Sequence, residues 1–98
     1  MAILLSDEQV RQFLAEHPLW KLERKELLRT FELPSFREAV GFVNRVAEVA
    51  EGNNHHPDID IRYRKVTLRL TSHDSGGLTA RDPKVAAECE RALEAARR

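Results

Sequence analysis

Asp58-Ile-Asp-Ile-Arg-Tyr-Arg-Lys-Val-Thr-Leu-Arg-Leu70 is the stretch of sequence that decides the fold. Its apolar residues occupy odd positions in the first half and even positions in the second, which one strand cannot do without a turn. A tight hairpin centred on Arg64-Lys65 pairs Ile61 with Leu68 and puts the apolar side chains on one face. The stretch predicts two antiparallel strands. The turn type stays open, because neither central residue favours a positive φ.

The same register, continued to the open end of the hairpin, places His56 opposite His73. Imidazole can both give and take a proton near neutral pH, so two rings beside Glu51 would form a pocket with titratable walls. His55 and His56 are adjacent, and adjacent side chains of extended backbone point to opposite faces. They can line two sides of a flat ligand but chelate one ion poorly. The spacing predicts a proton-transfer pocket and no metal site.

Upstream, the sequence predicts one helix and a second hairpin. Ser6 and Gln9 form a capping box, which starts a helix at Asp7 that ends at His17-Pro18. Two short strands with alternating apolar residues follow at 19–23 and 27–33, joined by a short charged link.

Two more helices flank the Asp58–Leu70 hairpin. Ser35 with Glu38 caps the first, and Gly52 is predicted to end it in the left-handed conformation. Its inner face is predicted to carry Phe36, Val40, Val43, Ala47 and Ala50, widened by Ala39 and Val46. The last helix starts near Thr79 or Asp82 and turns Val85, Cys89, Leu93 and Ala96 inward.

The element order α-β-β-α-β-β-α predicts an α+β fold, in which a four-stranded antiparallel sheet has three helices packed on one face. Ninety-eight residues with 42% hydrophobic content fit a single domain.

Charge and composition narrow the class of partner. Sixteen basic and sixteen acidic residues give no net charge, so no basic stripe favours nucleic acid. No apolar run reaches the length of a membrane span, and the run from Ala2 to Leu5 is too short for a signal peptide. Cys89 stands alone in a helical apolar pattern and is interpreted as an inert buried thiol. The expected setting is cytoplasmic.

Each candidate site residue also has an ordinary structural interpretation. His55 and His56 can be loop residues that merely form hydrogen bonds to the backbone before Pro57. Asp82 precedes a proline and can cap the last helix, or Thr79 can be the cap with Asp82 as the third helical residue. Trp20 can pack on the core.

The residues in order resemble a known signature: Glu51-x-x-x-His55-His56-Pro57, then Tyr63, His73 and Asp82. This pattern is similar to that of the pterin-4a-carbinolamine dehydratases, and the similarity covers nearly the whole chain as one domain, residues 1–98. The resemblance implies the α+β fold described above, assembled as a homodimer or homotetramer. It also implies loss of water from 4a-hydroxytetrahydrobiopterin to give quinonoid dihydrobiopterin, with no metal or organic cofactor.

The same resemblance assigns the site residues. His55 and His73 do the acid/base work, and His56 in the same catalytic group chiefly holds the pterin. Glu51 and Asp82 orient imidazoles or ring nitrogens beside Pro57, and Trp20 flanks the pocket by analogy.

The family also implies partners. Dehydration recycles the cofactor of an aromatic amino acid hydroxylase, so functional coupling to such an enzyme is expected, with no nucleic acid or membrane. Some animal members also serve as dimerisation cofactors for a homeodomain transcription factor, which makes a coactivator-type binding module the second hypothesis. A protein that binds pterin without turnover is the third.

Overall fold

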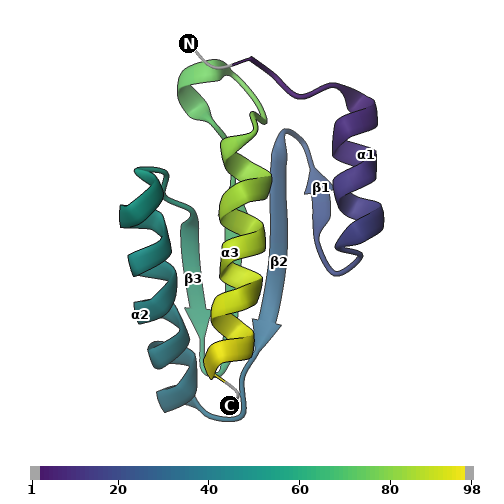
Figure 1. Cartoon of the computed structure of the whole chain (residues 1–98). Coiled ribbons are helices and arrows are strands. Elements are labelled where there is room, and N and C mark those ends of the chain that lie inside the picture. The colour runs from purple at the N-terminus through teal and green to yellow at the C-terminus, as the bar shows by residue number, and fades with distance from the viewer. Residues whose placement is uncertain (1–2, 97–98) are drawn as a thin grey trace.

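The structure is a computed structural model that describes residues 3–96, so Ala2 of the N-terminal apolar run lies outside it. Within these residues the helices are α1 (Asp7–Glu16), α2 (Phe36–Asn53) and α3 (Arg81–Ala96). The strands are β1 (Lys21–Glu23), β2 (Glu26–Glu32), β3 (Asp58–Arg62) and β4 (Lys65–Leu70). They form one antiparallel sheet in the order β1-β2-β4-β3, and the helices lie on one face of it (Figure 1). The predicted fold class is confirmed.

The first two predicted helix starts are made by local hydrogen bonds. At α1, Ser6 Oγ accepts from the backbone N–H of Gln9 at 3.1 Å, and Gln9 Oε1 accepts from the Ser6 N–H at 2.8 Å. At α2, Ser35 Oγ accepts from the Glu38 N–H at 3.2 Å. Each bond satisfies an amide that the first turn of a helix leaves without a partner.

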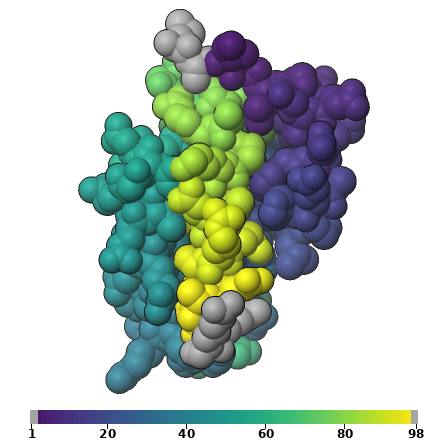
Figure 2. Space-filling model, in the orientation of Figure 1, coloured from purple at the N-terminus to yellow at the C-terminus, as the bar shows by residue number. Residues whose placement is uncertain are grey.

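The core lies between the sheet and the helices. Trp20, Phe31 and Phe42 form a row of aromatic rings, with centroids 6.0 Å and then 4.8 Å apart. In the space-filling view α3 fills the groove between α2 and α1, so the helices close this face of the sheet (Figure 2). Both Phe31 and Phe42 are fully buried, so the core is continuous beneath the helices.

Cys89 lies in this core as predicted, on the sheet-facing side of α3. Burial raises the pKa of its thiol to about 12, because a thiolate loses its hydration there. We expect Ellman's reagent to leave the native protein unlabelled at pH 8 and to titrate one thiol per chain in guanidinium chloride. Stoichiometric labelling of the folded protein within minutes would contradict the buried placement.

The predicted register of the second hairpin is wrong by two residues. Ile61 pairs with Val66 and Ile59 with Leu68, so the two-residue turn is Tyr63-Arg64. Tyr63 takes a positive φ of 54° and is 72% exposed, not a core residue. A slide of two residues keeps every apolar side chain on the same face, which is why the pattern did not distinguish the two registers.

The predicted inner face of α2 is wrong in part: Ala39, Val46 and Ala50 are buried as predicted, but Phe36 and Val40 are not. The buried residues are Ala39, Phe42, Val46 and Ala50, whereas Phe36 is 53% exposed and Val40 is exposed as well. The helix carries two neighbouring apolar stripes, and the sequence pattern alone does not say which one meets the sheet. The second stripe is left at the surface.

Candidate active site

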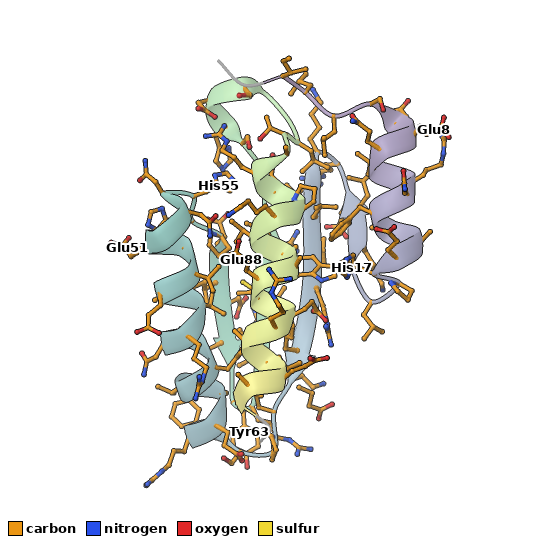
Figure 3. The ribbon with its side chains drawn as sticks, in the orientation of Figure 1. Glu8, His17, Glu51, His55, Tyr63 and Glu88 are labelled. Atoms are coloured by element: carbon orange, nitrogen blue, oxygen red, sulfur yellow. The ribbon has the colours of Figure 1, made fainter. Side chains whose placement is uncertain are left out.

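The end of α2 fixes the position of His55. The predicted left-handed residue, Gly52, is still helical, and Asn54 instead adopts φ 49°, ψ 42°. The Asn54 N–H donates to the Glu51 carbonyl at 3.3 Å and the His55 N–H to the Ala50 carbonyl at 3.1 Å, the two bonds of a Schellman motif. Asn tolerates this backbone conformation better than most residues. The chain therefore turns sharply, and His55 lies where α2 ends beside the start of α3 (Figure 3).

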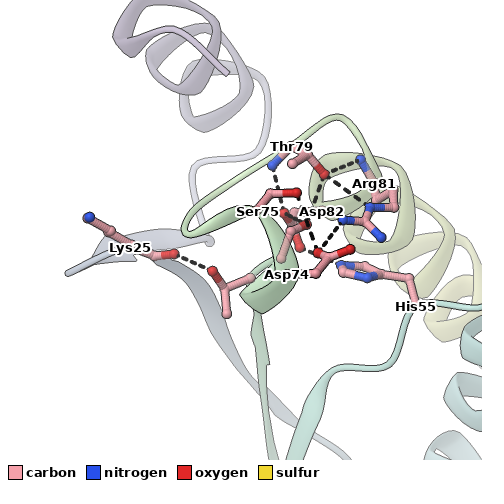
Figure 4. Close-up of polar contacts among 9 residues, drawn as sticks. Lys25, His55, Asp74, Ser75, Thr79, Arg81 and Asp82 are labelled. Atoms are coloured by element: carbon pink, nitrogen blue, oxygen red, sulfur yellow. Dashed lines mark hydrogen bonds and ion pairs between the residues drawn. The ribbon is translucent and has the colours of Figure 1, made fainter. Parts of the chain in front are cut away.

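His55 is held by a buried carboxylate. Its Nε2 lies 2.6 Å from Oδ1 of Asp82, whose side chain has no exposure to solvent. A carboxylate only accepts, so Nε2 carries the proton and Nδ1 is the nitrogen left for a ligand. Figure 4 shows the imidazole directed at Asp82 from the α2 side. The pair is thus oriented before any ligand arrives.

The other oxygen of Asp82 is held just as firmly. Oδ2 accepts from the hydroxyl of Ser72 at 2.8 Å and from the backbone N–H of Thr79 at 2.9 Å. The Thr79 hydroxyl in turn accepts from the backbone N–H of Arg81 at 3.3 Å. Thr79 is therefore the cap and Asp82 the third residue after it, which is one of the two predicted arrangements. Asp82 therefore completes the capping box of α3 and holds His55 at once.

Ser72 was missed by the sequence reasoning. Its hydroxyl also lies 2.8 Å from that of Thr79, and the residue is buried. The signal was present: Val66, Leu68 and Leu70 point inward on even positions, and Ser72 continues that series by one step. A polar residue at an inward position next to His73 marks a buried partner for a charged group.

A second imidazole–carboxylate pair lies at the surface. Nε2 of His56 is 2.5 Å from Oε2 of Glu51, and both side chains are more than half exposed. Figure 3 shows Glu51 on the outer side of α2, away from α3. Each of the two carboxylates expected to orient imidazoles therefore contacts one histidine, Asp82 a buried ring and Glu51 an exposed one.

His73 starts a short 3-10 helix, η1 (His73–Ser75), after the end of β4. It is exposed and lines a hollow of about 610 Å³ together with Lys25, Thr71 and Gly76. Within residues 3–96 no hydrogen bond joins it to His55 or His56, and it is no ladder partner of His56. The predicted pairing is wrong because the strand ends at Leu70 and the chain then coils.

The backbone of His73 is nevertheless anchored on both sides. Ser72, the residue before it, is bonded to Asp82, and Asp74, the residue after it, is bonded to Arg81 at 2.7 Å. The Arg81 guanidinium holds the pKa of the Asp74 carboxyl below its usual range. Both anchors, Arg81 and Asp82, belong to the first turn of α3 (Figure 4). The same turn therefore fixes His55 and the segment that carries His73.

Comparisons with known proteins identify the family of this chain. The model of the family described as "Pterin 4 alpha carbinolamine dehydratase" matches residues 3–92. The chain belongs to the pterin 4 alpha carbinolamine dehydratase family. The predicted resemblance, and the dehydratase class of enzyme that the family name carries, are confirmed.

Individual relatives cover nearly the full chain. A protein of Roseiflexus castenholzii named "Putative pterin-4-alpha-carbinolamine dehydratase" is 49% identical, over 92% of this chain and 97% of its own. A protein of the same name from Chloroflexus aurantiacus is 52% identical, over 85% of this chain and 89% of its own. A crystal structure of a transcriptional coactivator/pterin dehydratase from Brucella melitensis superposes with a TM-score of 0.87 at 26% identity, covering 92% of this chain and 98% of that one.

Trp20, and the signature residues Pro57 and Tyr63, lie away from the buried pair or serve the fold. Trp20 is 3% exposed, and its indole N–H donates to the Glu90 carboxylate at 3.2 Å. The same carboxylate forms an ion pair with Arg29. Glu90 follows Asp82 by eight residues, about 12 Å along the helix, so the indole is not beside His55. Pro57 is buried just before β3. Tyr63 lies at the opposite end of the molecule from His55 (Figure 3).

Two negative findings apply to residues 3–96 of this dehydratase-family chain. Nowhere in that range do three His, Cys, Asp or Glu side chains converge as metal ligands would. None of its helices combines the length and the apolar composition needed to cross a bilayer.

Proposed function

We propose that this chain removes water from 4a-hydroxytetrahydropterin to give the quinonoid dihydropterin, by acid/base catalysis at histidine. Beside the family membership, one observation carries the proposal: the buried Asp82 carboxylate holds the ring of His55 and the hydroxyl of Ser72, the neighbour of His73. The imidazole of His55 and the segment that carries His73 are thereby tied to one carboxylate. The pterin is proposed to bind between the end of α2 and η1.

The reaction needs one acid and one base. The C4a–O bond breaks and the hydroxyl leaves as water with a proton from one imidazole, while the other imidazole takes the proton from N5 and a C4a–N5 double bond forms. No electrons leave the substrate. His55 brings a free Nδ1 to this step, because its Nε2 is committed to Asp82. His73 is proposed as the opposite partner, with His56 and Glu51 holding the pterin beside Pro57.

The test is direct turnover. The carbinolamine is generated enzymatically, and its decay is followed by ultraviolet absorbance with and without the protein. We expect catalytic amounts of the chain to accelerate the decay well above the spontaneous rate. Decay at the spontaneous rate, with a pterin product analogue shown to bind by calorimetry, would leave binding without turnover as the function.

The biological setting belongs to the same proposal. Recycling of tetrahydrobiopterin couples the dehydratase to an aromatic amino acid hydroxylase and a dihydropterin reductase. A cytoplasmic location is supported by Cys89, a buried thiol in a chain with no second cysteine to pair with.

A coactivator role is the second candidate. It is favoured by the similar Brucella melitensis structure, which is described as a transcriptional coactivator as well as a pterin dehydratase. That role needs a protein partner and no titratable pocket, so it would survive replacement of His55 and His73. Dehydratase activity would be lost on the same replacements. Variants of His55 and His73 therefore distinguish the two functions.

We further propose that the chain forms a homodimer or homotetramer. β3 is an edge strand whose residues are all exposed, and Ile59 and Ile61 lie on its helix-facing side with exposures of 39% and 40%. The second apolar stripe of α2, with Phe36 and Val40, is exposed too. An antiparallel edge strand and an apolar helix face both match a second copy of themselves about a two-fold axis.

A charge on that stripe should weaken self-association. We expect Val40→Lys to shift the molecular mass measured by light scattering toward one chain, because a buried ammonium in an apolar interface is costly. Gln12→Lys adds the same charge to an exposed position of α1 and is the matched control. A single-chain mass for the unmodified protein at 100 µM would contradict the proposed assembly.

A further inference from the structure

A second cavity, of about 390 Å³, lies between α1, the β1–β2 turn and the segment 76–78. Its apolar walls are Leu4, Leu5, Val10, Leu14, Leu22 and Leu78. The volume lies at the lower end of the range of small-molecule sites, about 300–1,000 Å³. None of the histidines or carboxylates assigned to the dehydratase lines it.

Positive charge surrounds this apolar cavity. Arg11 of α1 and both turn residues, Arg24 and Lys25, line it, against the single carboxylate of Asp7. In the described part of the chain none of the three cations forms an ion pair. A Cβ placed on Gly77 would lie 3.4 Å from Leu4 Cδ2 and 4.0 Å from Lys25 Cδ, so the Lys25 stem crosses Gly77 beside Leu4.

The lining also says what the cavity does not bind. Among the described residues that form it there is no hydroxyl, side-chain amide or aromatic ring. A pterin or nucleobase needs such groups to fix its hydrogen-bonding edge and stack its plane. An unbranched aliphatic chain needs none of them, and its carboxylate would meet two guanidinium groups and an ammonium.

We propose that this cavity binds the anion of a medium-chain aliphatic carboxylic acid, with the tail against the leucines and the carboxylate at Arg11, Arg24 and Lys25. The cavity adjoins the hollow of His73, because Arg24, Lys25, Gly76 and Gly77 border both, but the proposed binding requires no dehydratase activity. The tail supplies most of the affinity by burial, and the head sets the preference for an anion.

The test is titration of sodium decanoate, below its micelle concentration, into the methyl-labelled chain, observed by NMR and calorimetry. We expect one ligand per chain, with methyl shifts at Leu14, Leu22 and Leu78. The neutral analogue 1-decanol should bind at least tenfold more weakly. Shifts centred on Val40 and Val43 of α2, or no binding at all, would overturn the proposal.

Two variants separate the head from the tail. Arg11→Gln/Arg24→Gln/Lys25→Gln should weaken decanoate tenfold or more and leave decanol unchanged. The control Arg37→Gln/Arg62→Gln/Lys65→Gln removes the same charges at exposed positions outside the cavity and should bind as the unmodified chain does. Leu22→Trp fills the cavity from the exposed side of β1 and should abolish binding of both ligands. Equal decanoate affinity in both triple variants would show that the decanoate carboxylate does not bind at Arg11, Arg24 and Lys25.

Discussion

Asp82→Ala is expected to lower the free energy of unfolding by about 3 to 5 kcal/mol, the largest stability loss predicted for this chain. The change leaves the His55 Nε2–H, the Ser72 hydroxyl and the Thr79 N–H without their acceptor in a site closed to water. It also removes the carboxylate half of the capping box at the start of α3, whose cap is Thr79. Urea unfolding followed by circular dichroism measures the loss, and a domain of this size should melt roughly 15 to 25 °C lower.

Two milder substitutions test the same network in steps. Ser72→Ala removes one donor and keeps the carboxylate and its bond to His55, so about 1 to 2 kcal/mol is expected. Asp74→Ala breaks a bond to Arg81 at the exposed side of the same turn and should cost less than either. An Asp82→Ala protein as stable as the Asp74→Ala protein would show that the buried bonds do not form.

His55→Ala and His73→Ala are each expected to reduce the dehydration rate by about 10²- to 10⁴-fold, the range for losing a general acid or base. The double variant should lose little more than the worse single one, because the two imidazoles serve one concerted proton movement. Ultraviolet absorbance of the decaying carbinolamine gives the rates. Calorimetry with a product analogue shows whether the pterin still binds.

Controls for this prediction lie in the same chain. The ring of His17 stacks on Phe13 at a centroid distance of 4.6 Å, in α1's C-terminal cap and away from Asp82, so His17→Ala removes an imidazole elsewhere and should turn over at close to the unmodified rate. His56→Ala should act mainly on KM, since its ring is exposed and paired with Glu51. If His73→Ala retained the full rate, the assignment of the second catalytic imidazole would be wrong.

Local chemistry made the helix starts predictable. The bonds of Ser6 with Gln9 and of Ser35 with Glu38 span three residues each, so the sequence contains both partners side by side. The faces of the hairpins were likewise predictable, because alternation has a period of two. From these elements the fold class followed without reference to long-range contacts.

Features that depend on contacts between residues far apart in the sequence were not predictable. The register of β3 with β4 depends on which residue accepts a positive φ, and Tyr63 is no better suited to it by type than Arg64 or Lys65. The choice between two apolar stripes of α2 is made by the sheet it meets. His55 and Asp82 were expected at the site through the family resemblance, but Ser72 acquires its role only when β4 and α3 are brought together.

The two-residue turn at Tyr63-Arg64 also restricts how this gene can change in length. A single codon inserted into or deleted from β3 would turn Ile59 and Ile61 out to the solvent side and carry Asp58 and Asp60 under the helices. A paired insertion or deletion would leave the inward and outward sets as they are. Evolutionary drift in hairpin length at this point is therefore confined to even steps, unless a compensating bulge arises beside it.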